Sequence, residues 1–509
     1  MGIIAKQGIK GTIVTYIGVA IGFVTTFFVI TRFLTAEEIG LARVLIDAAT
    51  LFIGLAQLGT SSSIIRFFPY FTGASPESTA VQPNREPPYH GFFAWTVYVP
   101  LLGFGIVALI YGACATPLQA WFGEKSPLFN EYYYAVLPLA FFMLYQTVFE
   151  TNANALMHIV LPRAVREIGV RLGMLATYVL YALGVLSMDG YVLCICLTYA
   201  VAALINLAYV IYLGGATLRP DWAFLRANKP LLRDYGLYTG FLIISALTGI
   251  LGPTLSTFFI TAKMGLDYTG IFAIATYIAV MVSIPYRSVT AISQPELAQA
   301  IKDDNKADIK RLLRQVSSNL LLIGGFIFLA IWMNIDLIFA ILPNGATYAI
   351  AKKTVFLLCL SQLILATFAI FTPAISYSKW YIFNLLCSLI LTISALLLNN
   401  YLIPRYGMDG AAAATLISNT IFYGLIAIIG CAVLKVFPFS RSHALSIVLL
   451  VAIGLADALL QRYIPWPNLW LSSIVRTIVL LGGGLWTAYR LHLSTEIDAL
   501  LHSIRLPRH

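Results

Sequence analysis

The sequence predicts an all-α polytopic membrane protein with 14 transmembrane helices. Hydrophobic residues make up 60% of the 509 residues and charged residues only 11%, whereas about a quarter of a soluble domain is charged. The apolar residues gather in runs of roughly 20, the length that a helix needs to cross a hydrocarbon core about 30 Å thick. Two sequence patterns also recur in the second half of the chain. These observations predict two pseudo-symmetric six-helix bundles plus two extra helices.

The apolar runs place the individual spans. In chain order we predict them at 12–31, 40–64, 92–112, 132–150, 168–187, 190–213, 236–260, 269–292, 317–341, 354–376, 380–402, 409–434, 443–460 and 470–490. Because the number of spans is even, both termini are expected on one side of the membrane. Lys6 and Lys10 precede the first run, which has no small-residue cleavage site. This favours an uncleaved first span over a signal peptide.

The recurring patterns predict two homologous halves. Gly40 and Gly270 each stand at the start of a long apolar run, and the tripeptide Met-Asp-Gly at 188–190 recurs at 408–410 between two apolar spans. Repeats of this kind are common in transporters. We therefore predict three parts: an N-terminal six-helix bundle at 1–234, a C-terminal six-helix bundle at 235–435, and two additional helices with a cytoplasmic tail at 436–509.

The charges in the loops predict the orientation. If the N-terminus is cytoplasmic, 22 of the 32 Lys and Arg residues lie in cytoplasmic loops and seven in outer loops, as the positive-inside rule requires. This bias explains the net charge of +10 without a nucleic acid partner. The six cysteines lie in or beside apolar runs, so they predict neither a disulfide framework nor a zinc site.

A polar stripe runs along the second predicted span. Arg43 and Asp47 are four residues apart and therefore share a helix face. The same face continues with Thr50, Gly54, Gln57 and Ser61. A charge at membrane depth costs about 2.5–3.5 kcal/mol, so this stripe is expected to face other helices or a wet cavity. Two interpretations stay open: Arg43 and Asp47 form an ion pair that holds two helices together, or they line a polar pathway.

Spans one and eight carry similar stripes. Span eight holds Arg287 and Thr290, and Arg287 has no carboxylate on its own helix face. Span one holds Gly18 and Gly22 on one face, and small residues at this spacing are typical of close helix packing. Because the stripes occupy matching places in the two halves, a central pathway between the halves explains them together.

The segment Pro295–Val316 follows span eight. Its apolar residues recur at helical spacing, with Lys310, Arg311 and Arg314 between them. This pattern predicts a basic amphipathic helix that lies on the cytoplasmic membrane surface and joins the two halves.

Three short motifs carry a resemblance to a known family. They are Arg32, Leu34, Glu38 and Gly40 ahead of the second span, the runs 58–60 and 65–67 at its end, and the turn 406–411 before span twelve. In order, spacing and number of spans, the whole chain resembles the polysaccharide-biosynthesis (Wzx-type) flippases. These flippases belong to the multidrug/oligosaccharidyl-lipid/polysaccharide exporter superfamily.

The resemblance implies a function and a location. Such flippases move a polyprenyl diphosphate that carries an oligosaccharide, such as an O-antigen repeat unit of lipopolysaccharide, from the cytoplasmic to the outer leaflet by alternating access. It implies the bacterial cell inner membrane, cytoplasmic termini, and polysaccharide polymerase and glycosyltransferases as partners. Related flippases place arginines in spans two and eight of a cationic cavity, which Arg43 and Arg287 fit. The neighbouring Asp47 departs from a purely cationic pattern.

The chemistry of a diphosphate selects the candidate residues. A guanidinium forms two parallel charge-assisted hydrogen bonds to phosphate. The expected substrate-binding residues are Arg43, Arg287, Asp47, Gln57 and Thr290. No nucleotide-binding GxxxxGK(S/T) motif occurs, so we expect no cofactor. The driving force would then be an H⁺ or Na⁺ gradient or the consumption of the product outside. The membrane carboxylates that can couple such an ion are Asp47, Glu150 and Asp457.

Three other classes of protein are alternatives to a polysaccharide flippase. A lipid II flippase belongs to the same superfamily and fits the same observations. A multidrug/toxin extruder would have twelve spans and usually carboxylates rather than arginines in its cavity. A membrane enzyme of polysaccharide assembly is less favoured, because a polymerase would carry a large outer loop and the outer loops here are short. The six histidines also form no catalytic spacing with Asp or Ser.

Overall fold

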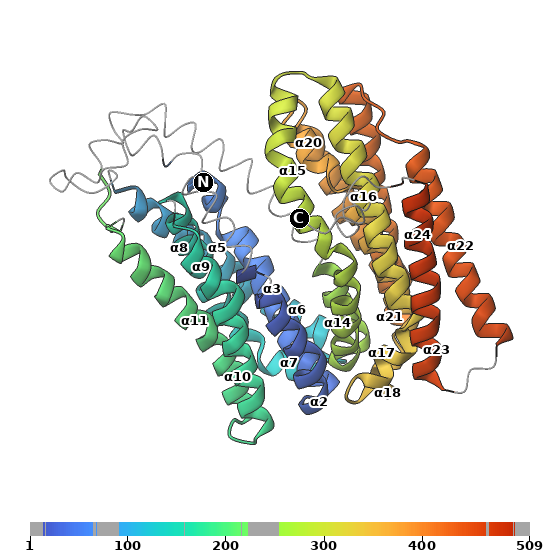
Figure 1. The fold of residues 1–509 in the computed structure, drawn as a ribbon. Coiled ribbons are helices and arrows are strands. Elements are labelled where there is room, and N and C mark those ends of the chain that lie inside the picture. The colour runs from blue at the N-terminus through green and yellow to red at the C-terminus, as the bar shows by residue number, and fades with distance from the viewer. Residues whose placement is uncertain are drawn as a thin grey trace, which may run out of the picture. The chain divides into compact units, whose positions relative to one another are not determined.

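The computed structural model describes residues 14–15, 17–64, 68, 91–156, 158–214, 216–221, 254–464, 468–491 and 493. Most of the span predicted at 236–260 lies outside these residues. Within them the chain forms helices joined by turns, and no strand occurs there (Figure 1). Eight helices in this part are long and apolar enough to cross a membrane: Ala36–Ala56, Phe92–Ala113, Met188–Tyr212, Leu266–Arg287, Lys306–Met333, Ile382–Leu434, Arg441–Tyr463 and Leu469–Arg490.

The chain divides into two compact units, Met1–Gly270 and Ile271–His509. The segment 254–270 belongs to the first unit by its contacts, since the Ser126 hydroxyl donates a hydrogen bond to the carbonyl oxygen of Thr261 at 2.7 Å. The boundary predicted at 234/235 falls outside the described residues, so the division into 1–234, 235–435 and 436–509 stays a prediction.

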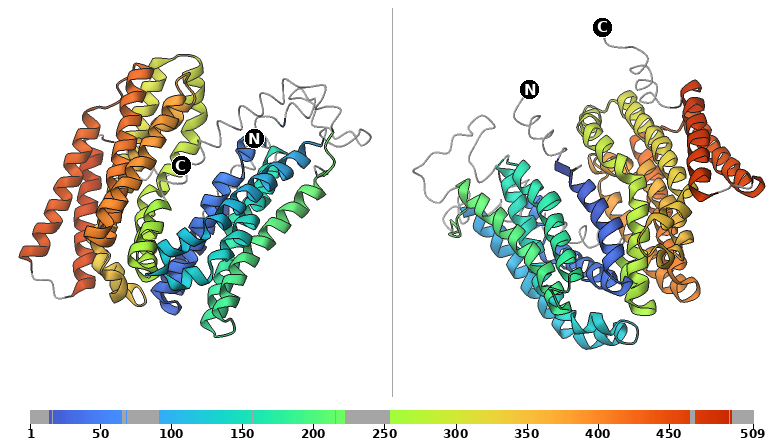
Figure 2. Two further views of the ribbon diagram at one scale, coloured as in Figure 1. Left: turned by 180° about the vertical axis from the view of Figure 1, so that it is seen from behind. Right: turned by 60° about the horizontal axis from the view of Figure 1, so that its bottom comes forward.

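The first unit is built around α8. Its elements are η1 (Thr25–Ile30), α2 (Thr31–Phe33), α3 (Ala36–Ala56), α5 (Phe92–Ala113), α6 (Ala115–Gly123), α7 (Pro127–Glu131), η3 (Tyr133–Ala135), α8 (Val136–Ala155), α9 (Val160–Ala164), η4 (Val165–Gly169), α10 (Val170–Ala182) and α11 (Met188–Tyr212). Helix α8 packs against α3, α5 and α11, and α11 lies beside it in both Figures 1 and 2. Leu144 and Val148 of α8 are fully buried in this core, together with Phe93 and Val210.

The second unit is built around α16. Its elements are α14 (Leu266–Val280, which begins in the first unit), η5 (Met281–Ser283), α15 (Ile284–Lys302), α16 (Lys306–Met333), α17 (Ile335–Ile341), α18 (Gly345–Ala349), α19 (Lys352–Phe368), α20 (Phe371–Ser376), α21 (Ile382–Leu434), α22 (Arg441–Tyr463), α23 (Leu469–Arg476), η6 (Thr477–Leu481) and α24 (Gly482–Arg490). Helix α16 packs against α15, α19 and α22. Phe326 of α16 contacts a cluster with Leu450 and Ile453 of α22 and Ala488 of α24. The two extra helices are therefore anchored on α16.

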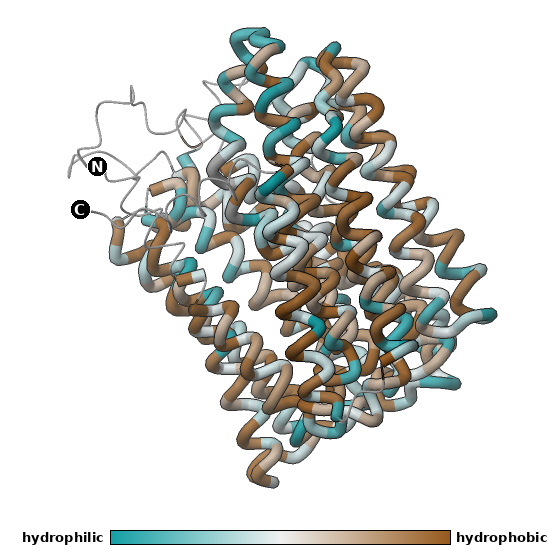
Figure 3. Tube along the Cα trace, turned by 45° about the vertical axis from the view of Figure 1, so that its right-hand side comes forward, coloured by the Kyte–Doolittle hydropathy of each residue, from teal (hydrophilic) through white to brown (hydrophobic). Residues whose placement is uncertain are grey.

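Large apolar side chains are exposed along the outer helices. Leu204 of α11 is 60% exposed and Val448 of α22 is 64% exposed. Figure 3 shows hydrophobic residues along the middle of many helices and more hydrophilic residues towards their ends. Exposed apolar surface of this extent is costly in water but is stable against lipid. The protein is therefore a multi-pass membrane protein.

The repeated Met-Asp-Gly tripeptide has the same local role in both units. Asp189 accepts a hydrogen bond from the Tyr132 hydroxyl at 2.6 Å, and Asp409 accepts one from the Thr354 hydroxyl at 2.7 Å. Tyr132 and Thr354 lie at the start of the fourth and tenth predicted spans, which are equivalent positions in the two halves. The sequence repeat therefore reflects a structural repeat.

Helix α21 contains two predicted spans. They meet at Gly407, whose backbone has φ 59° and ψ −135°, a conformation that no other residue type adopts without strain. The predicted boundary between the spans at 380–402 and 409–434 is therefore correct. The second predicted span, 40–64, is interrupted instead: α3 ends at Ala56, and Leu58 and Gly59 have φ of 46° and 69° before a short helical segment at 60–64.

The prediction that Pro295–Val316 forms an amphipathic helix on the membrane surface is wrong. Helix α15 runs on to Lys302, and α16 begins at Lys306 after a tight turn. Asp304 in that turn has φ 48°, and the Asn305 side chain caps α16 by accepting from the backbone N–H of Asp308. Asp and Asn tolerate this left-handed conformation and compete for backbone N–H groups. The apolar face was identified correctly, but it is buried between the ends of two spans rather than lying on a membrane.

The orientation predicted from loop charge can be measured. Reporter fusions after Lys302 are expected to show a cytoplasmic position, and fusions after Lys125 and Asn344 an outer position. The physical reason is that basic loops are retained on the cytoplasmic side during insertion. A reversed signal at any of these three sites would contradict the predicted order of spans.

Candidate functional site

The N-terminus of α3 is held in place by a capping box. The Thr35 hydroxyl accepts from the backbone N–H of Glu38, and the Glu38 carboxylate accepts from the N–H of Thr35 at 2.8 Å. The second Glu38 oxygen accepts a hydrogen bond from the Tyr181 hydroxyl of α10 at 2.5 Å. Glu38, part of the family-like motif, therefore fixes the start of the helix that carries the polar stripe.

Two glycines that the repeat makes equivalent pack against each other within the first unit. A Cβ on Gly40 would overlap the carbonyl oxygen of Leu266, and a Cβ on Gly270 would overlap that of Ala36. Each hypothetical Cβ would also lie 3.1 Å from the other glycine's backbone nitrogen. Both positions require glycine because the backbones of α3 and α14 touch there.

Arg43 and Asp47 form an ion pair on α3. The Arg43 Nε lies 2.8 Å from the Asp47 carboxylate, and the two side chains are 23% and 10% exposed. The i, i+4 spacing brings the two side chains onto one helix face, as the sequence predicted. The pair is only partly buried, so it leaves the Arg43 side chain in partial contact with its surroundings.

The rest of the stripe is engaged in local hydrogen bonds. The Thr50 hydroxyl donates to the carbonyl oxygen of Ile46 at 2.7 Å. The Ser61 hydroxyl donates to the Gln57 side-chain oxygen at 3.1 Å, across the break that ends α3. Gln57 and Ser61 therefore remain side by side although they no longer belong to one continuous helix.

Arg287 and Thr290 lie on α15 in the second unit. Arg287 is exposed, and within the described part of the chain no carboxylate lies at ion-pair distance from it. Thr290 is 4% exposed, and its hydroxyl donates to the carbonyl oxygen of Tyr286 at 2.6 Å. Arg287 is therefore available for an anionic ligand, whereas the Thr290 hydroxyl hydrogen is already used.

Each of the three membrane carboxylates has an arginine partner. Asp47 pairs with Arg43. Glu150 of α8 lies 2.8 Å from Arg166 of η4, and Asp457 of α22 lies 2.5 Å from Arg476 of α23. The Asp457–Arg476 pair joins the two extra helices.

The Asp457–Arg476 pair is the most buried of the three, and each side chain is 4% exposed. Arg476 also donates to the carbonyl oxygen of Met333 on α16, and Gln461 donates to Asp457. We therefore expect Arg476→Ala to lower the free energy of unfolding by about 3–5 kcal/mol, because it leaves a buried carboxylate unpaired. Thermal unfolding in detergent measures this. The double variant Asp457→Asn/Arg476→Gln should recover most of the loss, and equal loss in both variants would contradict the pairing.

The small residues of span one serve helix packing. A Cβ on Gly18 would lie 2.5 Å from the carbonyl oxygen of Glu167, and a Cβ on Gly22 would overlap the Arg171 guanidinium. Arg171 itself donates to the carbonyl oxygen of Gly18 at 2.7 Å. This face therefore contacts η4 and α10 rather than lining a pathway.

Sequence reasoning missed a basic pocket in the second unit. It lies between the first turns of α16 and α22, and Lys310, Arg311, Arg314 and Ser442 are among its lining residues. The spacing of Lys310, Arg314 and Ser318 already placed these three residues on one helix face. The periodicity of the segment Pro295–Val316 instead predicts a surface helix, which hides this pocket. In the described part of the chain, no cluster of three or more His, Cys, Asp or Glu side chains could hold a metal ion.

The fold is similar to those of several solved membrane proteins. No family model and no curated protein matches the chain. Among solved structures, the lipid II flippase MurJ in an inward closed conformation matches 95% of this chain and 99% of its own, with a TM-score of 0.65 and 14% identity. An inward-facing multidrug resistance MATE transporter of the MOP superfamily matches 78% and 90%, with a TM-score of 0.58 and 15% identity. The Vibrio cholerae MATE transporter VcmN matches 86% and 98%, with a TM-score of 0.57 and 12% identity.

These likenesses establish the fold. The predicted fold class is confirmed: an all-α polytopic membrane protein with 14 transmembrane helices, in two pseudo-symmetric six-helix bundles plus two extra helices. The proteins that it is similar to are transporters and flippases rather than enzymes.

Proposed function

We propose that this protein is a flippase for a polyprenyl-diphosphate-linked oligosaccharide, such as the repeat unit of an O-antigen or a similar polysaccharide. The observation that carries the proposal is Arg287, an exposed arginine at the end of a candidate membrane span with no carboxylate partner in the described part of the chain. A charge held within a membrane is costly unless it faces water or an anion. A diphosphate is an anion whose oxygens suit the guanidinium fork.

Arg43 is the second group that we assign to the diphosphate. It lies on the span that the repeat makes equivalent to the span of Arg287, and its pairing with Asp47 reduces the net positive charge of its face. A transporter must release its substrate, so the smaller net charge of the Arg43–Asp47 pair favours release over tight binding. Gln57 lies on the stripe of Arg43 and would contact the polar part of the substrate. Thr290 lies on the stripe of Arg287, but its side chain is 4% exposed, so it would reach the substrate only in another state of the transport cycle.

The two bundles support alternating access as the mechanism. In transporters built from a repeat, one bundle rocks against the other around a central site. The glycan would cross along the polar stripes, and the prenyl chain would stay in the lipid. This path removes the need to place the diphosphate in hydrocarbon, where unpaired ions are strongly disfavoured.

The ion-coupling role is assigned to Asp47 or Glu150. Both carboxylates pair with an arginine that is partly exposed, 23% for Arg43 and 48% for Arg166. Asp457 and its partner Arg476 are both buried, so an ion could not reach that carboxylate without separating α22 from α23. We therefore assign Asp457 a structural role rather than a role in ion coupling.

A lipid II flippase is the second candidate. The observation in its favour is the similarity to MurJ, which extends over 95% of this chain and 99% of that one. Both candidates transport an anionic lipid-linked substrate through the same fold, so the arginines serve either substrate. The difference lies in the glycan, which the site residues do not specify.

Complementation separates the candidates. The chain is expressed in one bacterial strain that lacks its O-antigen flippase and in another that is depleted of its lipid II flippase. We expect surface polysaccharide to return in the first strain and growth to fail in the second. Rescue of growth in the second strain alone would favour lipid II. Protection against cationic drugs, with neither rescue, would identify a multidrug exporter and overturn the proposal.

A further inference from the structure

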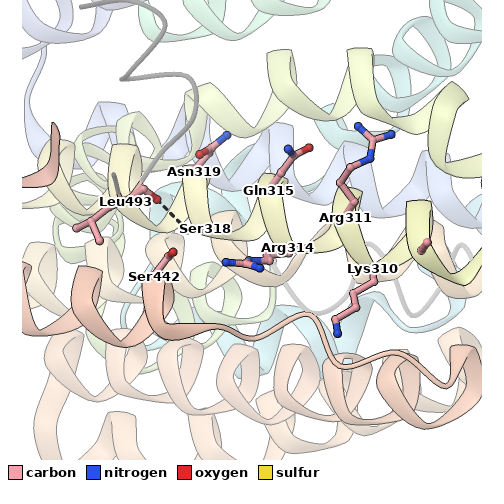
Figure 4. Close-up of a pocket in the computed structure, with 9 residues that line it drawn as sticks. Lys310, Arg311, Arg314, Gln315, Ser318, Asn319, Ser442 and Leu493 are labelled. Carbon is pink, nitrogen blue, oxygen red and sulfur yellow. Dashed lines mark hydrogen bonds between the residues drawn. The ribbon is translucent and has the colours of Figure 1, made fainter. Parts of the chain in front are cut away.

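The second unit contains a basic pocket of about 350 Å³ outside the stripe of Arg287. It lies between the first turns of α16 and α22, and Leu493 closes it near the chain's C-terminal part (Figure 4). Ser318 of α16 donates to the carbonyl oxygen of Leu493 at 3.4 Å. The Ser317 hydroxyl, one residue earlier, lies 2.9 Å from the His443 ring of α22. The first contact holds Leu493 against α16, and the second joins α16 to α22.

The charge in this pocket is positive, and two of its three cations have no carboxylate at ion-pair distance among the described residues. Lys310, Arg311 and Arg314 line it, and no carboxylate does. Arg311 already pairs with Glu296 and Asp308 at 2.8 and 3.1 Å. Within the described residues no carboxylate lies at ion-pair distance from Lys310 or Arg314. Figure 4 shows Lys310 and Arg314 extending on the side of Ser442, whereas Arg311 extends the opposite way.

The start of α22 adds to the attraction for an anion. Helix α22 is 23 residues long and begins at Arg441, so Ser442 lies in its first turn. Backbone N–H groups in the first turn of a helix lack intrahelical partners, and the helix dipole makes this end positive. The N–H of His443 already donates to the carbonyl oxygen of Ser440 at 3.1 Å, so the attraction comes from the helix dipole and the earlier N–H groups of this turn. An anion between Arg314 and Ser442 would therefore meet side-chain cations from one helix and the positive end of another.

An apolar surface continues from the pocket along α22. Leu445 and Val448 are 41% and 64% exposed, three and six residues after Ser442. Leu445 follows Ser442 by three residues and Val448 follows Leu445 by three, so each lies beside the one before it on the helix surface. A ligand with a charged head in the pocket could thus lay an apolar chain along α22. A free phosphate compound would use the pocket but not this surface.

We propose that the pocket binds the phosphate-bearing headgroup of an anionic membrane lipid. Lys310 and Arg314 hold the phosphate, Ser442 and the first turn of α22 complete the site, and the acyl chains lie along Leu445 and Val448. The loop-charge bias predicts this end of the unit to be cytoplasmic. Basic pockets between membrane helices on that side are suited to anionic lipid headgroups. The site is separate from the proposed transport arginines, so it does not depend on the transported substrate.

Lipid binding to the full-length protein tests this proposal. The protein is purified in neutral detergent, and native mass spectrometry measures binding of phosphatidylglycerol against phosphatidylcholine. We expect the parent to prefer phosphatidylglycerol. In Lys310→Ala/Arg314→Ala the ratio of phosphatidylglycerol to phosphatidylcholine binding should fall about thirtyfold, because each basic side chain near a membrane surface contributes about fivefold. The matched control Lys302→Ala/Lys306→Ala removes two exposed charges from the same helical hairpin and should keep the preference.

A second variant guards against a folding defect. Ser442→Trp keeps both cations and fills the pocket, and it should also lose the preference while its unfolding temperature without lipid stays near that of the parent. Equal preference in the parent and the pocket variants would overturn the proposal, as would equal loss in the Lys302/Lys306 control. Thermal stabilisation by inorganic phosphate but not by phosphatidylglycerol would assign the pocket to a soluble phosphate compound and overturn the lipid assignment.

Discussion

Replacing Arg287 with Ala is expected to abolish glycan export while the protein stays folded in the membrane. Arg287 is exposed, and no carboxylate in the described part of the chain pairs with it. Its removal therefore breaks no ion pair in the described chain. A substrate diphosphate would lose two charge-assisted hydrogen bonds, each worth about 1.5–3 kcal/mol. Transport should fall roughly a hundredfold or more, measured as surface polysaccharide in a complemented strain at matched protein level.

Two further variants make this result specific. Arg287→Lys keeps the charge but loses the bidentate fork, so it should restore export only in part. Lys302→Ala removes an exposed charge from the same helix, α15, and should leave export unchanged. Export at the parental rate by Arg287→Ala would remove the main support for an anionic substrate in this site.

The second large effect on glycan export is expected from substitutions of Arg43 and Asp47. We expect Arg43→Ala to stop export, and we expect the double variant Arg43→Ala/Asp47→Asn to remain inactive. The reason is that the double change removes the unpaired carboxylate but does not return the guanidinium that would hold the diphosphate. Surface polysaccharide and membrane protein level are measured for both variants side by side.

The opposite result has a clear physical meaning. If Arg43 serves only to neutralise Asp47, the double neutral variant should export as well as the parent, since removing both members of a pair often costs little. Parental export by the double variant would therefore reduce Arg43 to a structural role and leave Arg287 as the arginine of the site. Asp47→Asn alone tests coupling: loss of gradient-driven export with retained substrate binding would assign the ion to Asp47.

Local spacing was enough to predict several features. Arg43 and Asp47 meet because residues four apart share a helix face, whatever surrounds them. The boundary at Gly407 was predictable because a glycine in a turn signal separates two apolar runs of membrane-spanning length. The repeated Met-Asp-Gly tripeptide identified equivalent positions, and both aspartates accept a hydrogen bond from a hydroxyl at the start of the span two places earlier.

Apolar periodicity alone could not separate a surface helix from the buried ends of two spans. The segment Pro295–Val316 has the spacing of an amphipathic helix, yet it folds as a hairpin. Leu297 and Leu313 are fully buried against α20 and α21. The turn at Asp303–Asn305 decided the outcome, because Asn305 caps α16 and allows the chain to reverse. A sequence pattern records which face is apolar, but it does not record what covers that face.

The sequence by itself determined the membrane class, the order of most spans, the twofold repeat and the Arg43–Asp47 pair, since each depends on composition or on residues within one or two turns. Only the tertiary structure decided which partners distant residues meet. It paired Glu150 with Arg166 across a helix junction, and it brought Gly40 against Gly270. It also joined Lys310 and Arg314 with Ser442 in one pocket. These contacts depend on how helices pack, and packing is set by the fit of whole surfaces rather than by the spacing of residues along one helix.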